Sequence, residues 1–257
     1  VITPYAELHC ISNFSFLTGA SHPEELVEQA KKLGYHSIAI TDECSVAGVV
    51  RAHVAARAAD IKLLIGSEFK LEEGTRFILI AKNRDGYGYM CNLISTARRR
   101  ASKGEYYLSQ KHFKDVEINC IVICLPNTDL SKERQIKDLV WLKHYFKNQV
   151  WIGVAQLLLN HEKKQILAIE RLSQFMMVPL VAIGSAHMHI PERRMLRDTI
   201  HAIRIKKTLK NSGYELSQNG EGYLRSIDSI ERLYSSQLIT ETLAIANQCN
   251  FDLSTLK

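Results

Sequence analysis

Several motifs that would assign a function directly are missing from this 257-residue chain. Its six cysteines include no CxxC pair, so a metal site or a disulfide is the weaker interpretation of them. The chain also has no GxxxxGK(S/T) phosphate loop and no GxSxG nucleophile elbow. We therefore expect neither P-loop nucleotide binding nor catalysis of the α/β-hydrolase type.

Long apolar segments are missing as well. No apolar run approaches the roughly 20 residues that a helix needs to cross a bilayer. The amino terminus lacks the basic-then-apolar order of a signal peptide. We therefore expect no membrane contact and a reducing, cytoplasmic setting. In that setting Cys120 and Cys124, which share one apolar run, are typical of buried thiols.

The composition is that of a globular protein, with 46% hydrophobic and 23% charged residues. The net charge of +6 permits weak attraction to nucleic acid. Many soluble enzymes are equally basic, however, so the charge alone does not assign DNA binding.

Short apolar runs alternate with amphipathic segments, which is typical of repeated strand–helix units. The apolar runs lie near residues 5–10, 37–41, 62–70, 76–81, 119–125, 150–155 and 179–183. Seven such units predict an α/β fold with a parallel sheet closed, or nearly closed, into a barrel. An open doubly wound sheet is the alternative.

The pattern changes near residue 206, where a polar, glycine-containing stretch precedes a helix or helix pair over residues 228–249. We therefore divide the chain into a barrel domain, residues 1–205, and an irregular and helical extension, residues 206–257, that leads out of the barrel. In the first helix we expect Ser21 as the N-cap and Glu24 as its capping-box partner, with Gly34 after its end.

Polar side chains at the carboxyl ends of barrel strands are the candidates for chemistry, because those ends meet at one mouth. They are His9, Asp42, Glu43, Glu68, Asn127, Asp129, Ser185, His187 and His189. Among them His9, Glu68 and His187 form a two-histidine, one-carboxylate set that suits zinc with a bound water, and Glu43 is a possible fourth ligand or base. The alternative is a buried His9–Glu68 pair that only orders the mouth.

A Ser–His–Asp arrangement of Ser185, His187 and Asp42 is the weaker hypothesis, because a histidine two residues along a loop does not necessarily face the serine. Basic runs allow a different function. We expect Arg98, Arg99, Arg100 and Lys103 to end a helix that starts near Tyr87, either as solvated charges or as contacts to DNA phosphates. The same two interpretations apply to the second basic run, Arg193, Arg194, Arg197, Lys206 and Lys207.

A family resemblance rests on residues 7–53, ELHCISNFSFLTGASHPEELVEQAKKLGYHSIAITDECSVAGVVRAH, and continues through GSEF and PLVAIGSAHMHIPERRMLRDTIHAIRIKKTL. The chain resembles the amino-terminal PHP (polymerase and histidinol phosphatase) domain of bacterial C-family DNA polymerases, above all the error-prone, translesion branch. The resemblance implies a distorted seven-stranded barrel with a C-terminal helical extension. It further implies that the polymerase palm, with its Mg²⁺, lies in a longer chain that contacts DNA, a sliding clamp and translesion accessory proteins.

The resemblance also implies a depleted metal site. PHP domains that hold three metals use about nine ligands, and His9, Glu68 and His187 match that pattern. Other ligand positions carry different residues, namely Ile11, Thr18, Glu43, Arg76, Asn127 and Ser185. We therefore expect no cofactor, with Arg76 pairing with Glu68 or Glu43 in the former site.

Three functions follow from these observations. The first is a non-catalytic scaffold within an error-prone DNA polymerase. The second is a residual phosphoesterase or 3′–5′ exonuclease that uses Zn²⁺ or Mn²⁺. The third, a free-standing hydrolase of the histidinol-phosphatase type, does not account for the carboxyl-terminal extension.

Overall fold

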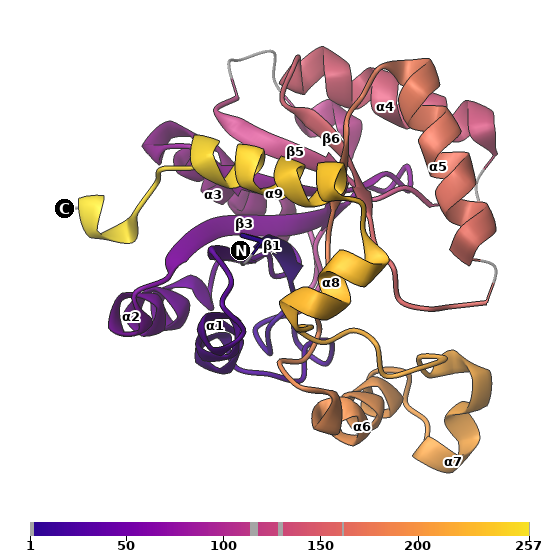
Figure 1. The fold of residues 1–257 in the computed structure, drawn as a ribbon. Coiled ribbons are helices and arrows are strands. Elements are labelled where there is room, and N and C mark those ends of the chain that lie inside the picture. The colour runs from indigo at the N-terminus through magenta and orange to yellow at the C-terminus, as the bar shows by residue number, and fades with distance from the viewer. Residues whose placement is uncertain (1–2, 114–117, 128–130, 161, 257) are drawn as a thin grey trace.

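The computed structural model describes residues 3–113, 118–127, 131–160 and 162–256. Asp129 lies outside these residues. Within them the chain forms one seven-stranded sheet with strand order β1-β2-β3-β4-β5-β6-β7. The strands are β1 (Ala6–Cys10), β2 (Ser37–Ile40), β3 (Lys62–Lys70), β4 (Arg76–Ala81), β5 (Cys120–Cys124), β6 (Val150–Val154) and β7 (Leu180–Ala182). The sheet curls into a nearly closed barrel (Figure 1), so the predicted α/β barrel is confirmed.

The sheet is not wholly parallel, which corrects one expectation. Strand β4 runs antiparallel to both β3 and β5, and the other neighbouring pairs are parallel. The physical reason is the short connection between β3 and β4. It closes as a hairpin in which Leu71 N donates to Thr75 O at 2.9 Å, whereas a parallel crossover needs a dozen or more residues.

Helices cover the outside of the sheet and extend beyond it (Figure 1). The α-helices are α1 (Pro23–Lys32), α2 (Val49–Ala59), α3 (Arg84–Arg98), α4 (Lys132–Phe146), α5 (Glu162–Met176), α6 (Arg194–Arg204), α7 (Leu209–Ser212), α8 (Ile227–Leu233) and α9 (Ser236–Gln248). Short 3-10 turns occupy Gln110–His112, Pro191–Arg193, Gly213–Glu215 and Leu253–Thr255. The predicted helix or helix pair over 228–249 is the pair α8 and α9.

Two helix starts differ from the sequence prediction. The N-cap of α1 is His22, not Ser21, and His22 N donates to Glu25 Oε2 at 2.8 Å. The hydroxyl of Ser21 is instead engaged with His189 Nδ1 at 2.8 Å. Helix α3 begins three residues before Tyr87, because the side chain of Asn83 accepts from Gly86 N and caps it.

Helix α9 packs where the barrel is not closed by strand pairing. Between β1 and the chain after β7 there is one isolated bridge, Cys10 with Ala186, among the described residues. Helix α9 packs against both β1 and β7, and its residues Ile245 and Ala246 are fully buried with Leu8 of β1. This part of 206–257 therefore packs against the barrel, and the division of the chain at residue 205 into a barrel and an extension stays a prediction.

Candidate functional site at the barrel mouth

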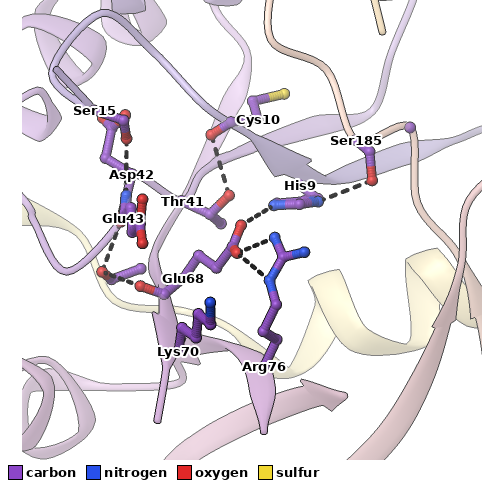
Figure 2. Close-up of polar contacts among 12 residues, drawn as sticks. His9, Cys10, Ser15, Thr41, Asp42, Glu43, Glu68, Lys70, Arg76 and Ser185 are labelled. Carbon is purple, nitrogen blue, oxygen red and sulfur yellow. Dashed lines mark hydrogen bonds and ion pairs between the residues drawn. The ribbon is translucent and has the colours of Figure 1, made fainter. Parts of the chain in front are cut away.

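The residues of the candidate site reach one mouth of the barrel from strands that are distant in sequence (Figure 2). His9 comes from the end of β1 and Glu68 from the end of β3. Because β4 is antiparallel, its first residue, Arg76, lies at the same mouth and is paired in register with Lys70. Ser185 follows β7 and lies on the other side of His9.

Glu68 is held from two sides. Its Oε2 lies 2.9 Å from His9 Nε2, and its Oε1 accepts from Arg76 Nε at 3.1 Å and from Arg76 Nη2. A carboxylate can only accept, so Nε2 of His9 carries the proton, and Nδ1, 3.1 Å from Ser185 Oγ, is the acceptor when the ring is neutral. Both carboxylate oxygens and both ring nitrogens are therefore engaged within the protein.

The electrostatics of Glu68 follow from these contacts. Burial alone would raise its pKa. The hydrogen bond and charge of His9, with the guanidinium of Arg76, outweigh burial and lower the pKa of Glu68 from 4.5 to about 2. Glu68 is therefore a carboxylate at neutral pH, and its charge is neutralised by a fixed cation.

His187 lies at the mouth but not within this network. Its buried Nδ1 has no hydrogen-bond partner in the described part of the chain. Burial, followed by the charge of Arg197, lowers the pKa of His187 from 6.5 to about 3. Across residues 3–113, 118–127, 131–160 and 162–256, no three histidine, cysteine or acidic side chains are grouped to hold a metal ion.

The two acidic residues after β2 have separate partners. Glu43 Oε1 accepts from the hydroxyl of Tyr106 at 3.0 Å. Asp42 is buried and accepts from the hydroxyls of Ser12 at 2.6 Å and Ser15 at 2.7 Å. Since Ser185 Oγ faces His9, the structure does not assemble the Ser185–His187–Asp42 arrangement.

The first basic run is divided between two environments. Arg98 donates to backbone oxygens of Glu43, Cys44, Gly104 and Glu105 at 3.1–3.2 Å, so its guanidinium holds loops together. Arg99, Arg100 and Lys103 are exposed. These three remain the predicted DNA contacts, whereas Arg98 has little donor capacity left for a phosphate.

A cavity of about 430 Å³ opens beside the Glu68–Arg76 pair. We call it the mouth cavity. It is lined by Ile11, Thr18, Glu43, Glu68, Lys70, Arg76, His187, Arg197, Asp198, His201, Arg204 and Ser217. Sequence reasoning did not name Lys70, His201 or Arg204 for this site. The available signal was the spacing of Arg197, His201 and Arg204, which places them on one face of a helix.

Comparison with known proteins identifies the class. The PHP domain family matches residues 7–155, and the chain belongs to this family. It is 44% identical over 254 residues to the error-prone DNA polymerase of Methylococcus capsulatus, which covers 98% of this chain and 24% of that protein. It is 43% identical over 258 residues to the error-prone DNA polymerase of Dechloromonas aromatica, covering 98% and 25%. The resemblance seen in the sequence is thus confirmed, and the chain spans about a quarter of the length of these relatives.

Solved structures share the fold. An amidohydrolase from Chromobacterium violaceum, with bound sulfate and no metal, superposes with a TM-score of 0.52 at 12% identity. A candidate metal-dependent phosphoesterase from Bifidobacterium adolescentis gives 0.51 at 16% identity. Each match covers 72% of this chain and 88% of the other. In the part of the chain that the structure describes, no helix is long and apolar enough to span a membrane.

Proposed function

We propose that this chain is the PHP domain portion of an error-prone DNA polymerase and acts there as a non-catalytic scaffold with a degenerate metal site. The relatives are DNA polymerases about four times its length, which supports placing DNA synthesis, and its Mg²⁺, in a different part of such a protein. DNA-directed DNA synthesis in replication and translesion repair is then the activity of the whole polymerase. Contacts with DNA, a sliding clamp and accessory proteins belong to the same proposal.

The observation that carries the scaffold proposal is the state of Glu68. A carboxylate that binds metal ions must offer free lone pairs to them, but here His9 and Arg76 occupy both oxygens of Glu68. Arg76 also cannot give up its charge, because a guanidinium stays protonated in proteins. The residues present therefore do not fit a cluster of divalent ions.

The pairing has a second consequence that supports the scaffold. A carboxylate and an imidazole left unpaired in a buried site carry a desolvation cost of several kcal/mol. The side chains of His9 and Glu68 are only 4% and 7% exposed, so Arg76 supplies compensation that the metal ions of other PHP domains would otherwise give. The mouth is then an ordered part of the barrel without needing a cofactor.

Elemental analysis and metal titration test the proposal. We expect the purified chain to contain much less than one transition-metal ion per molecule, and Zn²⁺ and Mn²⁺ to bind no more tightly than they bind the His9→Ala variant. The same protein should not degrade 3′ ends of DNA in Mn²⁺. A stoichiometric ion with sub-micromolar affinity that is lost in His9→Ala would instead support the residual phosphoesterase or exonuclease.

A further inference from the structure

In the described part of the chain, the acidic side chains that line the mouth cavity have bonded partners, whereas several of the basic ones have no ion-pair partner. Each carboxylate on its wall already has a partner. Glu68 is bound by His9 and Arg76, and Glu43 accepts from Tyr106. The third carboxylate, Asp198, has its Oδ2 3.5 Å from Arg194 Nε, which is not among the residues that line the cavity.

Several cations on the same wall have no such partner. Within the described ranges, no ion pair within 4 Å is found for the side chains of Lys70, Arg197 and Arg204. Arg204 Nη1 donates to the hydroxyl of Thr18 at 2.8 Å. Arg197 interacts over a longer range with Asp198, and it is half-buried. A partly desolvated cation without a bonded anion is costly, so a bound anion would stabilise Arg197, whereas Lys70 and Arg204 are exposed.

The three cations line the mouth cavity from different elements. Arg197 and Arg204 are seven residues apart on α6, with His201 between them, so all three lie on one helical face. Lys70 comes from the end of β3, on the same side of the strand as Glu68 because side chains alternate. The cavity is therefore enclosed between a helix and a strand end, and both provide positive charge.

The local backbone leaves room for this arrangement. Gly222 has no side chain where Arg197 approaches it. A Cβ there would lie 3.2 Å from Arg197 Nη1. The cavity volume of about 430 Å³ is also within the range of roughly 300–1,000 Å³ typical of sites for small ligands.

We propose that the mouth cavity binds a phosphate group without a metal ion, with Arg197, Lys70 and Arg204 as its cationic contacts. Guanidinium groups match the geometry of phosphate oxygens with paired N–H donors, and lysine adds a point charge. His187, whose Nδ1 has no hydrogen-bond partner among the residues that the structure describes, adds one more polar atom near the same wall. The mouth at which the family resemblance implies metal ligands would then hold an anion here. This inference does not depend on the scaffold role.

The test is calorimetric titration of the chain at constant ionic strength with EDTA present throughout. The probes are inorganic phosphate, a deoxynucleoside 5′-monophosphate, and one short oligonucleotide with and without a 5′-phosphate. We expect saturable binding that needs the phosphate group. Tight binding of the monophosphate assigns a small molecule as the source, and binding confined to the phosphorylated oligonucleotide assigns a DNA end.

Matched variants locate the binding. Arg197→Gln should weaken phosphate binding about tenfold or more, the usual effect of losing a charge-assisted hydrogen bond. The control is Arg57→Gln, because Arg57 lines a separate cavity of about 400 Å³ beside Asp60 and Asp252. That variant should bind as the unmodified chain does. If Arg197→Gln does not fold, Lys70→Gln at an exposed strand end replaces it, with the same expectation.

Two results would overturn the proposal. One is the lack of any saturable, phosphate-dependent heat in the unmodified chain. The other is equal affinity of the Arg197→Gln, or the replacement Lys70→Gln, and Arg57→Gln variants. Binding that appears only when EDTA is replaced by Zn²⁺ or Mn²⁺ would also contradict it, and would at the same time count against the scaffold. A metal-independent site with no nuclease activity leaves both proposals standing.

Discussion

At the level of single residues, Arg76 and His187 have opposite effects on the charge at the mouth of the barrel. Arg76 brings a permanent charge to within hydrogen-bonding distance of Glu68, and one oxygen of that carboxylate is occupied by it. His187, in contrast, is kept neutral by burial and by the nearby charge of Arg197, which lower its pKa to about 3. Arg76 thus neutralises the charge of Glu68, and His187 stays uncharged.

The suppressed protonation of His187 predicts a pH dependence of stability. Between about pH 6.5 and pH 3 the unfolded chain binds a proton at this residue that the folded chain does not, so the free energy of unfolding falls as the pH falls. Urea unfolding at pH 7 and pH 5 should show this loss. In His187→Gln the difference between the two pH values should shrink by about 1–2 kcal/mol.

His144 provides the control for this experiment, because it is exposed on α4. The His144→Gln variant should keep the full pH difference of the unmodified chain. A His187→Gln variant with an unchanged pH difference would show that residue 187 is protonated in the folded protein as readily as in the unfolded one, contrary to the structure.

At the level of elements, helix α3 contains two glycines, Gly86 and Gly88, whose surroundings differ. Close packing requires glycine at the first position, whereas helix propensity favours a larger residue at the second. Gly86 is buried, and a Cβ there would collide with the carbonyl oxygen of Asn119 ahead of β5. Gly88 lies on the same helix, is exposed, and has open space where a Cβ would stand. The two glycines therefore have different reasons for their presence.

The same substitution at these two positions should have opposite effects. Gly86→Ala should destabilise the fold by about 1–3 kcal/mol, because the helix must move off the sheet. Gly88→Ala should stabilise it by about 0.5–1 kcal/mol, since alanine loses less backbone entropy in a helix. Chemical unfolding of the two variants in parallel measures both values. A stabilised Gly86→Ala protein would mean that α3 does not approach β5 as closely as described.

At the level of the whole molecule, the carboxyl-terminal helix α9 packs where β1 and β7 are not paired along their length. Thr242 Oγ1 of this helix accepts from Ala6 N of β1 at 3.1 Å. Ile245 is fully buried in a cluster with side chains of β1 and β7. These contacts tie the last part of the chain to its first strand, so we expect barrel and α9 to unfold together.

Truncation of Ile245 tests this cooperativity. Ile245→Ala should lower the free energy of unfolding of the whole barrel by about 2–4 kcal/mol, with a single transition seen by the fluorescence of Trp141 in α4 and Trp151 in β6. Leu256→Ala, at an exposed position after α9, should change it by less than about 0.5 kcal/mol. If Ile245→Ala instead gave two separate transitions, the division of the chain at residue 205 would mark independent domains.

The sequence by itself was sufficient for the barrel and for the family. Seven apolar runs predicted seven strands because side chains buried on both faces leave a continuous apolar pattern. Gly34 correctly marked the end of α1, where φ is +79°. The family was evident from local motifs, since these are contiguous in the chain.

Only the tertiary structure decided which polar side chains meet. The family resemblance implied that Arg76 lies in the former site. The antiparallel direction of β4 that brings it there depends on a hairpin that strand periodicity does not report. The mouth cavity joins Lys70 to Arg197 and Arg204, which are more than 120 residues away in the chain. The return of α9 to the barrel depends on an unpaired sheet edge. Contacts between distant segments depend on the packing of the whole chain, and local sequence patterns do not encode them.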